Sequence, residues 1–160
     1  MAIQNFALNM PAYAVGRRVN MEEWNTITRT KEGTGTVAFG APVMAGTADH
    51  TCVALIATTG QNVLGITEAA LTLPHIGDAY EQYDYVAVCE VGVIGVLLGA
   101  NVTKGAQARW NTANGTWTGA AQSATVVTIP GAQFDESGVN GAVGVIRYRR
   151  PVPSLSVSGA

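Results

Sequence analysis

The residues best suited to metal chemistry lie in one short segment of the chain. His75, Asp78 and Glu81 follow one another at three-residue intervals, and side chains of these types bind zinc and activate water. Pro74 and Gly77 interrupt the same segment, so neither a helix nor a strand would hold the three side chains in a fixed geometry. We therefore expect a solvated surface loop. The competing hypothesis is a small enzyme that uses the His75 loop.

The remaining candidates for chemistry lack the partners that chemistry needs. Asp49-His50 lies at an expected turn, and neither Cys52 nor Cys89 has a basic neighbour in the sequence to generate a thiolate. The segment Gly33-Thr34-Gly35 lacks the lysine of a phosphate-binding loop. The sequence thus predicts no catalytic residues, no metal, no cofactor and no enzymatic activity. It also predicts that both cysteines are reduced and buried.

Two clusters of arginine could carry recognition instead. Arg17 and Arg18 are adjacent near the N-terminus, and Arg147, Arg149 and Arg150 lie near the C-terminus. The second cluster is either a solvated strand end or a docking site for an acidic protein surface. The net charge of −2 provides no basic face for nucleic acid.

The whole chain is sparsely charged. Charged residues make up 12% of the sequence, against roughly 25% in an ordinary soluble protein. Because solubility favours a charged surface, this composition predicts that much of the surface meets other protein rather than water. The first residues lack the basic start and apolar core of a secretory signal.

The elements that must position these residues are β-strands. The run from Tyr85 to Ala100 is rich in valine, isoleucine and leucine, which pack well on a pleated sheet. Its glycines would each cost roughly 1 kcal/mol inside a helix. Glu90 divides the run, and a membrane span needs about 20 predominantly apolar residues. We expect a buried core strand and no membrane segment.

A β-hairpin should follow at Asn114-Gly115, a two-residue pair that favours a type I′ turn. Such a turn would place Thr112 opposite Trp117 and Trp110 opposite Gly119. The two indoles would then lie in diagonal contact on one face of the sheet.

Short apolar runs separated by turn residues continue along the chain, a pattern typical of an all-β sandwich or barrel. The expected runs are Val37–Gly40, Ala41–Met44, Cys52–Ala57, Asn62–Thr67, Ser123–Ile129 and Ala142–Tyr148. Pro130-Gly131 should end the run before it. In the last run, Ile146 and Tyr148 should face one way, and Arg147 and Arg149 the other. We expect a compact β-sandwich or β-barrel-like domain at 36–150 and a peripheral tail at 151–160.

Residues 1–35 form an expected extended N-terminal arm, because apolar residues are scattered there without a sustained period. Within it, the alternation of Thr26–Thr30 is consistent with an edge strand. Phe6, Tyr13 and Trp24 have no core of their own in this segment. The rings must therefore lie either on the body of the same chain or on a neighbouring subunit.

The order and spacing of small motifs around turns resemble those of the tailed-phage structural cement (head decoration) proteins. The similarity extends over about Pro11 to Tyr148. The motifs that carry it are Pro11-Ala12-Tyr13-Ala14-Val15-Gly16, Phe39-Gly40-Ala41-Pro42-Val43, Val63-Leu64-Gly65-Ile66-Thr67, Val91-Gly92-Val93-Ile94-Gly95-Val96, Val102-Thr103-Lys104-Gly105, Trp110, Asn114-Gly115, Gly131-Ala132-Gln133-Phe134 and Ala142-Val143-Gly144-Val145-Ile146-Arg147.

The resemblance implies a non-enzymatic virion protein, made in the host cytoplasm, on the outer surface of the phage head. It implies major capsid protein as a partner, at junctions between capsid subunits of the expanded shell, and self-association as a homotrimer or other small oligomer. Nucleic acid and membrane are not expected partners. The residues expected to contact the capsid or a neighbouring subunit are Phe6, Pro11, Tyr13, Arg17, Arg18, Trp24, Arg147 and Arg149.

The competing binding hypothesis is a carbohydrate-binding or adhesin-like β-module displayed on the virion. In such a module Trp110 and Trp117 would be exposed platforms for stacking against sugars. Burial of the two indoles would favour the cement protein.

Overall fold

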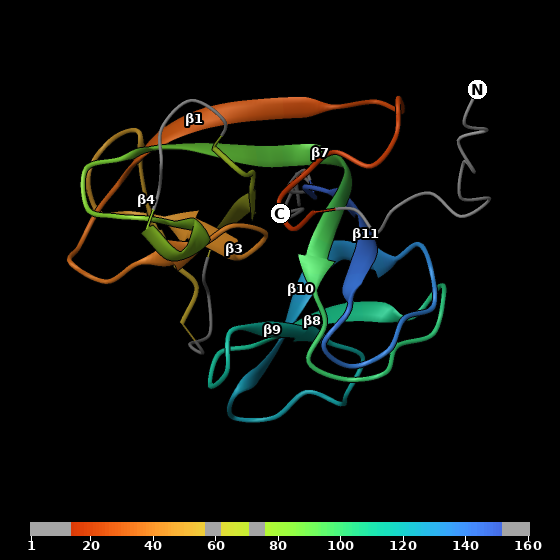
Figure 1. Ribbon diagram of the computed structural model, residues 1–160. Helices are drawn as coiled ribbons and strands as arrows, with labels where there is room; N and C mark the ends of the chain where they lie inside the picture. Colours follow the sequence, from red (N-terminus) through yellow and green to blue (C-terminus); the bar gives the residue numbers. More distant parts are fainter. Residues whose placement is uncertain (1–13, 57–61, 71–75, 152–160) are drawn as a thin grey trace, which may run out of the picture.

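The computed structural model describes residues 14–56, 62–70 and 76–151 (Figure 1). These residues form β-strands and loops, with one 3₁₀ turn at Ile76–Asp78, so the predicted all-β class is confirmed. The strands are β1 Asn25–Lys31, β2 Val37–Ala38, β3 Pro42–Ala45, β4 Thr51–Ala54, β5 Val63–Thr67, β6 Ala79–Tyr80, β7 Tyr85–Leu97, β8 Gln107–Asn111, β9 Thr116–Thr118, β10 Val126–Phe134 and β11 Val143–Arg149. No helix in the described ranges is long and apolar enough to cross a membrane.

Strand β7 is the axis of the molecule and confirms the predicted core strand. Its 13 residues run through both halves of the fold. The first half pairs with β1 and β5, and the second half pairs with β11. Val88, Ile94 and Val96 on this strand are fully buried. The β-branched run is therefore apolar because both of its faces are covered.

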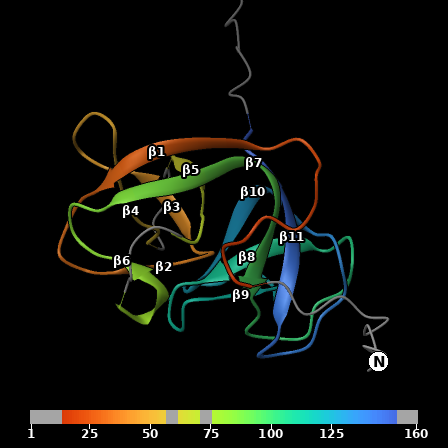
Figure 2. The same ribbon diagram turned by 45° about the horizontal axis from the view of Figure 1, so that its top comes forward.

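The N-terminal half is a five-stranded barrel in the order β1-β4-β3-β5-β7, which closes because β1 also pairs with β7 (Figure 2). Four of these contacts are antiparallel, and the contact between β1 and β4 is parallel. A ring with an odd number of strands cannot alternate in direction all the way round. One parallel contact is therefore required by closure, and the short β1–β4 pairing supplies it.

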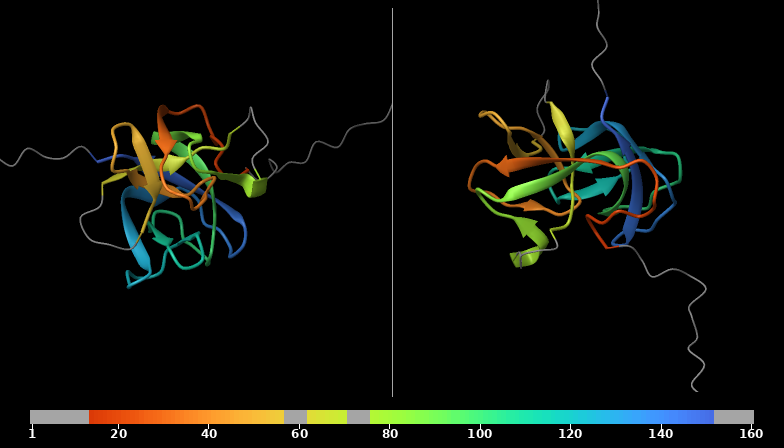
Figure 3. Two further views of the ribbon diagram at one scale, coloured as in Figure 1. Left: turned by 90° about the vertical axis from the view of Figure 1, so that its left-hand side faces the viewer. Right: turned by 90° about the horizontal axis from the view of Figure 1, so that it is seen from above.

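The C-terminal half is also a ring of five strands, formed by β7, β11, β10, β8 and β9. These strands pair antiparallel in that order. A parallel bridge between Leu98 and Trp117 joins β9 to the end of β7 and closes this half. Next to it, Gly99 N–H donates to the Trp117 carbonyl at 2.8 Å. We call this half the C-terminal ring. Seen from above, the barrel and the ring lie side by side with β7 common to both (Figure 3).

The structure places part of the predicted arm within the barrel. Thr26–Thr30 belongs to β1, which pairs with β7 along most of its length instead of lying on the surface as a separate arm. The alternating threonines expose one face of β1 and turn Ile27 toward the core. Sheet structure thus begins at Asn25 rather than at residue 36.

Two local predictions were wrong. The hairpin loop has four residues instead of two, since Trp110 pairs with Trp117 and Asn111 with Thr116. Asn111 Oδ1 accepts a hydrogen bond from Ala113 N–H at 3.0 Å, which favours the longer turn. Strand β10 also continues through Pro130-Gly131, where its pairing shifts register.

Candidate interaction surfaces

The described start of the chain lies along the second half of β7. Gly16 N–H donates to the Gly95 carbonyl at 2.8 Å, and Val19 N–H donates to the Val93 carbonyl at 3.0 Å. Ala69 N–H donates to the Gly16 carbonyl at 2.8 Å from the other side. The backbone is therefore fixed, whereas the side chain of Arg17 is exposed.

Trp24 lies on the body of its own chain. Its ring covers Gly92 of β7, where a Cβ atom would approach the ring within 2.2 Å, so only glycine leaves room for it. The indole Nε1 donates to Thr26 Oγ1 at 2.8 Å, and the Arg18 guanidinium lies 5.4 Å from the ring centroid. The sequence left open whether this ring lies on its own chain or on a neighbouring subunit. The described contacts of Trp24 are all within its own chain.

The C-terminal arginines are held in ion pairs with the loop before β1. Arg147 binds the Glu22 carboxylate and lies 3.3 Å from Asp135, and Arg149 binds Glu23. The hydrogen bond from Arg147 lowers the pKa of Glu22 below its ordinary value. A cleft of about 340 Å³ lies between these pairs and β7. The predicted alternation of β11 is confirmed, because Ile146 and Tyr148 are buried while both arginines are exposed.

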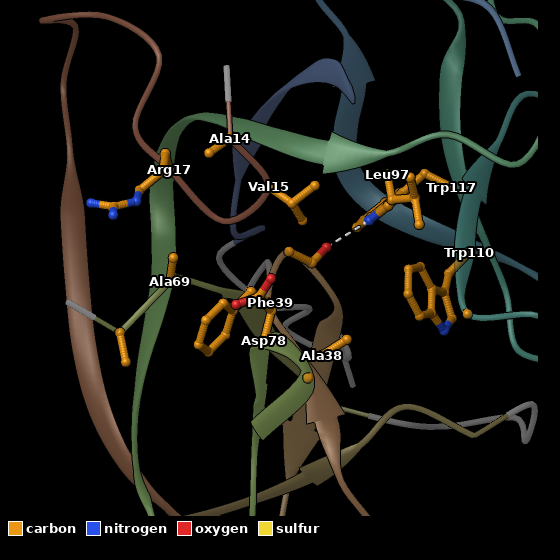
Figure 4. A pocket seen from close by; sticks show the side chains of 14 residues that line it. Ala14, Val15, Arg17, Ala38, Phe39, Ala69, Asp78, Leu97, Trp110 and Trp117 are labelled. Atoms are coloured by element: carbon orange, nitrogen blue, oxygen red, sulfur yellow. Dashed lines mark hydrogen bonds between the residues drawn. The ribbon is translucent and has the colours of Figure 1, made fainter. Parts of the chain in front are cut away.

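A larger pocket of about 410 Å³ lies where the chain start, the barrel and the C-terminal ring meet (Figure 4). Phe39 and Asp78 line its barrel side, Trp110 and Trp117 line its ring side, and Val15 lies between them. The lining is mostly apolar, and its charged members are Arg17 and Asp78. This pocket can accept an apolar side chain, but it lacks the convergent polar groups of an active site.

The two tryptophans are core residues. Trp117 is fully buried and Trp110 is 8% exposed, and their rings meet edge to face at 5.5 Å. Trp117 Nε1 donates to the Gly40 carbonyl at 2.7 Å, which joins the ring to the barrel (Figure 4). Sugars stack on exposed aromatic faces, so this burial removes the platforms that a carbohydrate-binding module would need here.

The far end of the barrel presents two tyrosines that the sequence interpretation did not single out. Tyr83 and Tyr85 are 74% and 78% exposed. The loop that carries them is fixed by hydrogen bonds from Tyr83 N–H to the Lys31 carbonyl at 2.9 Å and from Lys31 N–H to the Asp84 carbonyl at 2.8 Å. Lys31 itself is 2% exposed and donates from Nζ to the Gly33 carbonyl at 2.7 Å. The only signal in the sequence is a Tyr-Asp-Tyr triplet at the start of the core strand.

The candidates for metal and thiol chemistry are not assembled into a site. His75 lies outside the described residues, and no group of three metal-ligating side chains occurs within the described ranges. Cys52 and Cys89 are free and buried, as predicted. Burial raises the pKa of Cys52 to about 11 and that of Cys89 to about 12, so both thiols stay protonated at neutral pH.

Comparison with known proteins identifies the family. The family model described as structural cement protein (E217 gp24/Pam3 gp6) matches residues 3–149. The chain belongs to the phage structural cement protein family. The cement protein is thus a structural component of the phage virion and not an enzyme, as the resemblance implied.

Solved structures share the fold at low sequence identity. One chain from "The capsid of Myoviridae Phage XM1" superposes with a TM-score of 0.70 at 16% identity, covering 94% of the cement protein and 99% of that chain. Another, from "The crystal structure of head fiber gp8.5 N base in bacteriophage phi29", gives a TM-score of 0.44 at 14% identity, covering 83% and 100% of the two chains. No curated protein sequence matches the cement protein.

Proposed function

We propose that the cement protein binds the outer surface of the phage head at junctions between major capsid subunits and stabilises the expanded shell. The observation that carries this proposal is the family match, which extends over both halves of the fold and most of the N-terminal segment. The likeness of the whole fold to a chain of a phage capsid structure supports it.

The surface chemistry supports a structural role between proteins. With 12% charged residues, the molecule offers broad, weakly charged faces rather than a deep polar pocket. Many copies on one shell act multivalently, so each contact can be modest while the whole layer holds firmly. We propose self-association into a trimer or other small oligomer as part of this arrangement.

We propose that the N-terminal arm grips a neighbouring subunit. The first 13 residues contain no charged side chain and include Phe6, Pro11 and Tyr13. The chain reaches Ala14 beside the apolar pocket, and Arg17 is exposed next to it. An extended apolar segment can add a strand or insert rings across a seam between subunits.

Four further residues proposed for partner contacts lie at the base of the arm, where we propose that they also fix its direction. Trp24, Arg18, Arg147 and Arg149 already have intramolecular partners. We propose that they fix the direction in which the arm leaves the body, and that their exposed edges contact the partner only after the arm is bound.

Co-sedimentation with expanded shells that lack the cement protein tests this proposal. The full chain should bind at a fixed number of copies per shell. A variant that begins at Ala14 keeps the hydrogen bonds of Gly16 and Val19 to β7 and should fold, but it should be lost from the shells on washing. Full occupancy by the truncated protein would contradict the role of the arm, and no binding by the full chain would contradict the function.

A further inference from the structure

We propose that the far end of the barrel is a second docking surface, which recognises a positively charged, partly apolar surface of the capsid shell. We call it the barrel tip, and it comprises the loops 32–36, 46–50 and 81–84 together with Tyr85. This inference rests on the proposed function, but it concerns a part of the molecule that includes none of the residues proposed above for partner contacts. Figure 2 shows these loops together at the end of β1 and β7 that lies away from the C-terminal ring.

The first argument is backbone strain at an exposed tyrosine. Tyr83 has a φ of 70°, in the left-handed region that bulky side chains rarely adopt. Glycine would relax this position, and the ring of Tyr83 is too exposed to contribute to the core. Strained residues of this kind cluster at functional sites, so the position of Tyr83 points to a use for its side chain.

The second argument is that two exposed tyrosines lie two residues apart on a hydrogen-bonded support. Tyr85 opens β7 opposite Thr30 of β1, two residues from Tyr83. Asp84 Oδ2 accepts a hydrogen bond from Glu81 N–H at 2.7 Å, and this bond closes the turn 81–84, which carries Tyr83. Tyrosine presents a large amphipathic ring at a low entropic cost, and it is enriched at the energetic centres of interfaces.

The third argument is charge. The C-terminal arginines Arg147, Arg149 and Arg150 are ion-paired with carboxylates outside the tip, at Glu22, Glu23, Asp135 and Glu90. The barrel tip carries Glu32, Asp49, Glu81 and Asp84. The basic residues beside it are Arg29 and the buried Lys31, so the acidic side chains outnumber the basic ones. A surface that fits the rings of the tip must therefore be basic to be electrostatically complementary.

The position of the tip makes a second contact useful. The arm lies along β7 at Gly95, and Tyr85 is the first residue of the same strand. At 3.3 Å per residue the two are about 33 Å apart along the strand. A molecule held at both ends can reach two different subunits, and the second contact forms at a high effective concentration once the first is made.

The experiment compares three full-length variants, which are a tip variant, a control and Glu81→Lys, with the unmodified protein on expanded shells that lack it. The tip variant Tyr83→Gly/Tyr85→Ser removes both rings, and Tyr83→Gly also relieves the strained φ, so its melting temperature should not fall. The control is Val139→Ser, which removes a side chain that is 63% exposed in the loop before β11. Binding is measured by co-sedimentation over a concentration series.

The tip variant should bind about tenfold or more weakly, the control should bind as the unmodified protein does, and Glu81→Lys should also weaken binding. Equal binding by the tip variant would overturn the inference while leaving the proposed function intact. A changed oligomeric state of the tip variant without shells would also overturn it, because the occupant would then be a second copy. Loss of binding by every variant and by the unmodified protein would overturn both.

Discussion

Glu32 shows how a single side chain can hold a loop of this barrel in place. Its carboxylate accepts hydrogen bonds from Thr47 N–H and Thr51 Oγ1, both at 2.8 Å, and from the Thr47 hydroxyl. These donors, the Thr47 hydroxyl first among them, lower the pKa of Glu32 from 4.5 to about 2. The charged form is therefore the one that the folded loops stabilise.

Because the folded pKa of Glu32 is depressed, its contribution to stability is present above pH 4.5 and is lost as the pH falls toward 2. The variant Glu32→Gln should melt at a lower temperature than the unmodified protein at pH 7. The difference should shrink through this window and vanish near its lower end. Melting curves recorded between pH 2 and pH 7 check this, and a constant difference at all pH values would contradict it.

Gly131 offers a prediction with a matched control. Gly131 and Gly105 have φ values of 79° and 81°, but a Cβ atom at Gly131 would lie 2.0 Å from the Arg149 carbonyl oxygen, whereas one at Gly105 meets nothing within 4 Å. Gly105→Ala should cost roughly 1–2 kcal/mol from the backbone alone. Gly131→Ala should cost more, about 2–4 kcal/mol, because strand β10 must also move. Urea denaturation measures both, and equal costs would contradict the close approach.

At the residue scale the sequence predicted burial better than exposure. The reduced cysteines and the facing of β11 followed from apolar patterning. The exposed rings of Tyr83 and Tyr85 did not, because tyrosine is equally at home in a core and at a surface. Tyr83 lies in a turn with a positive φ, whose backbone is hydrogen-bonded to Lys31, 52 residues away in the sequence.

At the scale of elements, the link between the barrel and the C-terminal ring depends on Trp117. The strand pairing of β9 covers only three residues. The indole nevertheless reaches the Gly40 carbonyl of the barrel, in a buried hydrogen bond. The element is small, but its side chain crosses the boundary between the halves.

Trp117→Phe should therefore lower the free energy of unfolding by about 1–3 kcal/mol, because the Gly40 carbonyl loses its buried partner. Trp110→Phe is the matched control, since the indole N–H of Trp110 makes no hydrogen bond with any described residue. The control should cost less. Chemical denaturation followed by circular dichroism compares them, and an equal or larger loss in the control would contradict this role of Trp117.

The strands themselves were largely predictable, but their pairings were not. The core strand β7 and the approximate positions of β3, β4, β5 and β11 follow from β-branched runs between turns. The hairpin register was missed because the Asn111 side chain competes with the Asn114-Gly115 pair for the turn. The end of β10 was misplaced because a proline and a glycine are tolerated where a strand bulges. Closure through the parallel β1–β4 contact is non-local, and no short-range pattern encodes it.

At the scale of the whole molecule, two closed rings share one strand. Since β7 contributes to both, neither ring can lose its sheet without exposing core residues of the other. This arrangement predicts a single cooperative unfolding transition. Tryptophan fluorescence reports mainly on the C-terminal ring, through Trp110 and Trp117, whereas circular dichroism reports on both halves. The two denaturation curves should coincide, and separated midpoints would contradict the shared core.

The family resemblance was visible in the sequence because its motifs lie at turns whose spacing is set by strand length. The candidate contacts were harder to predict. The C-terminal arginines looked available for docking, but the loop before β1 folds back to neutralise them. Tertiary pairing decides which surface a charged side chain serves, and no local pattern in the sequence indicated the barrel tip.

The continuity of β7 also bears on how the molecule would respond to force. Its neighbours β1 and β11 run antiparallel to it on successive halves of its length, and their hydrogen bonds lie across the strand. A force that pulls β7 lengthwise against β1 or β11 would load those bonds together in shear instead of opening them one at a time. The strand β7 would therefore separate from its neighbours only when many hydrogen bonds break at once.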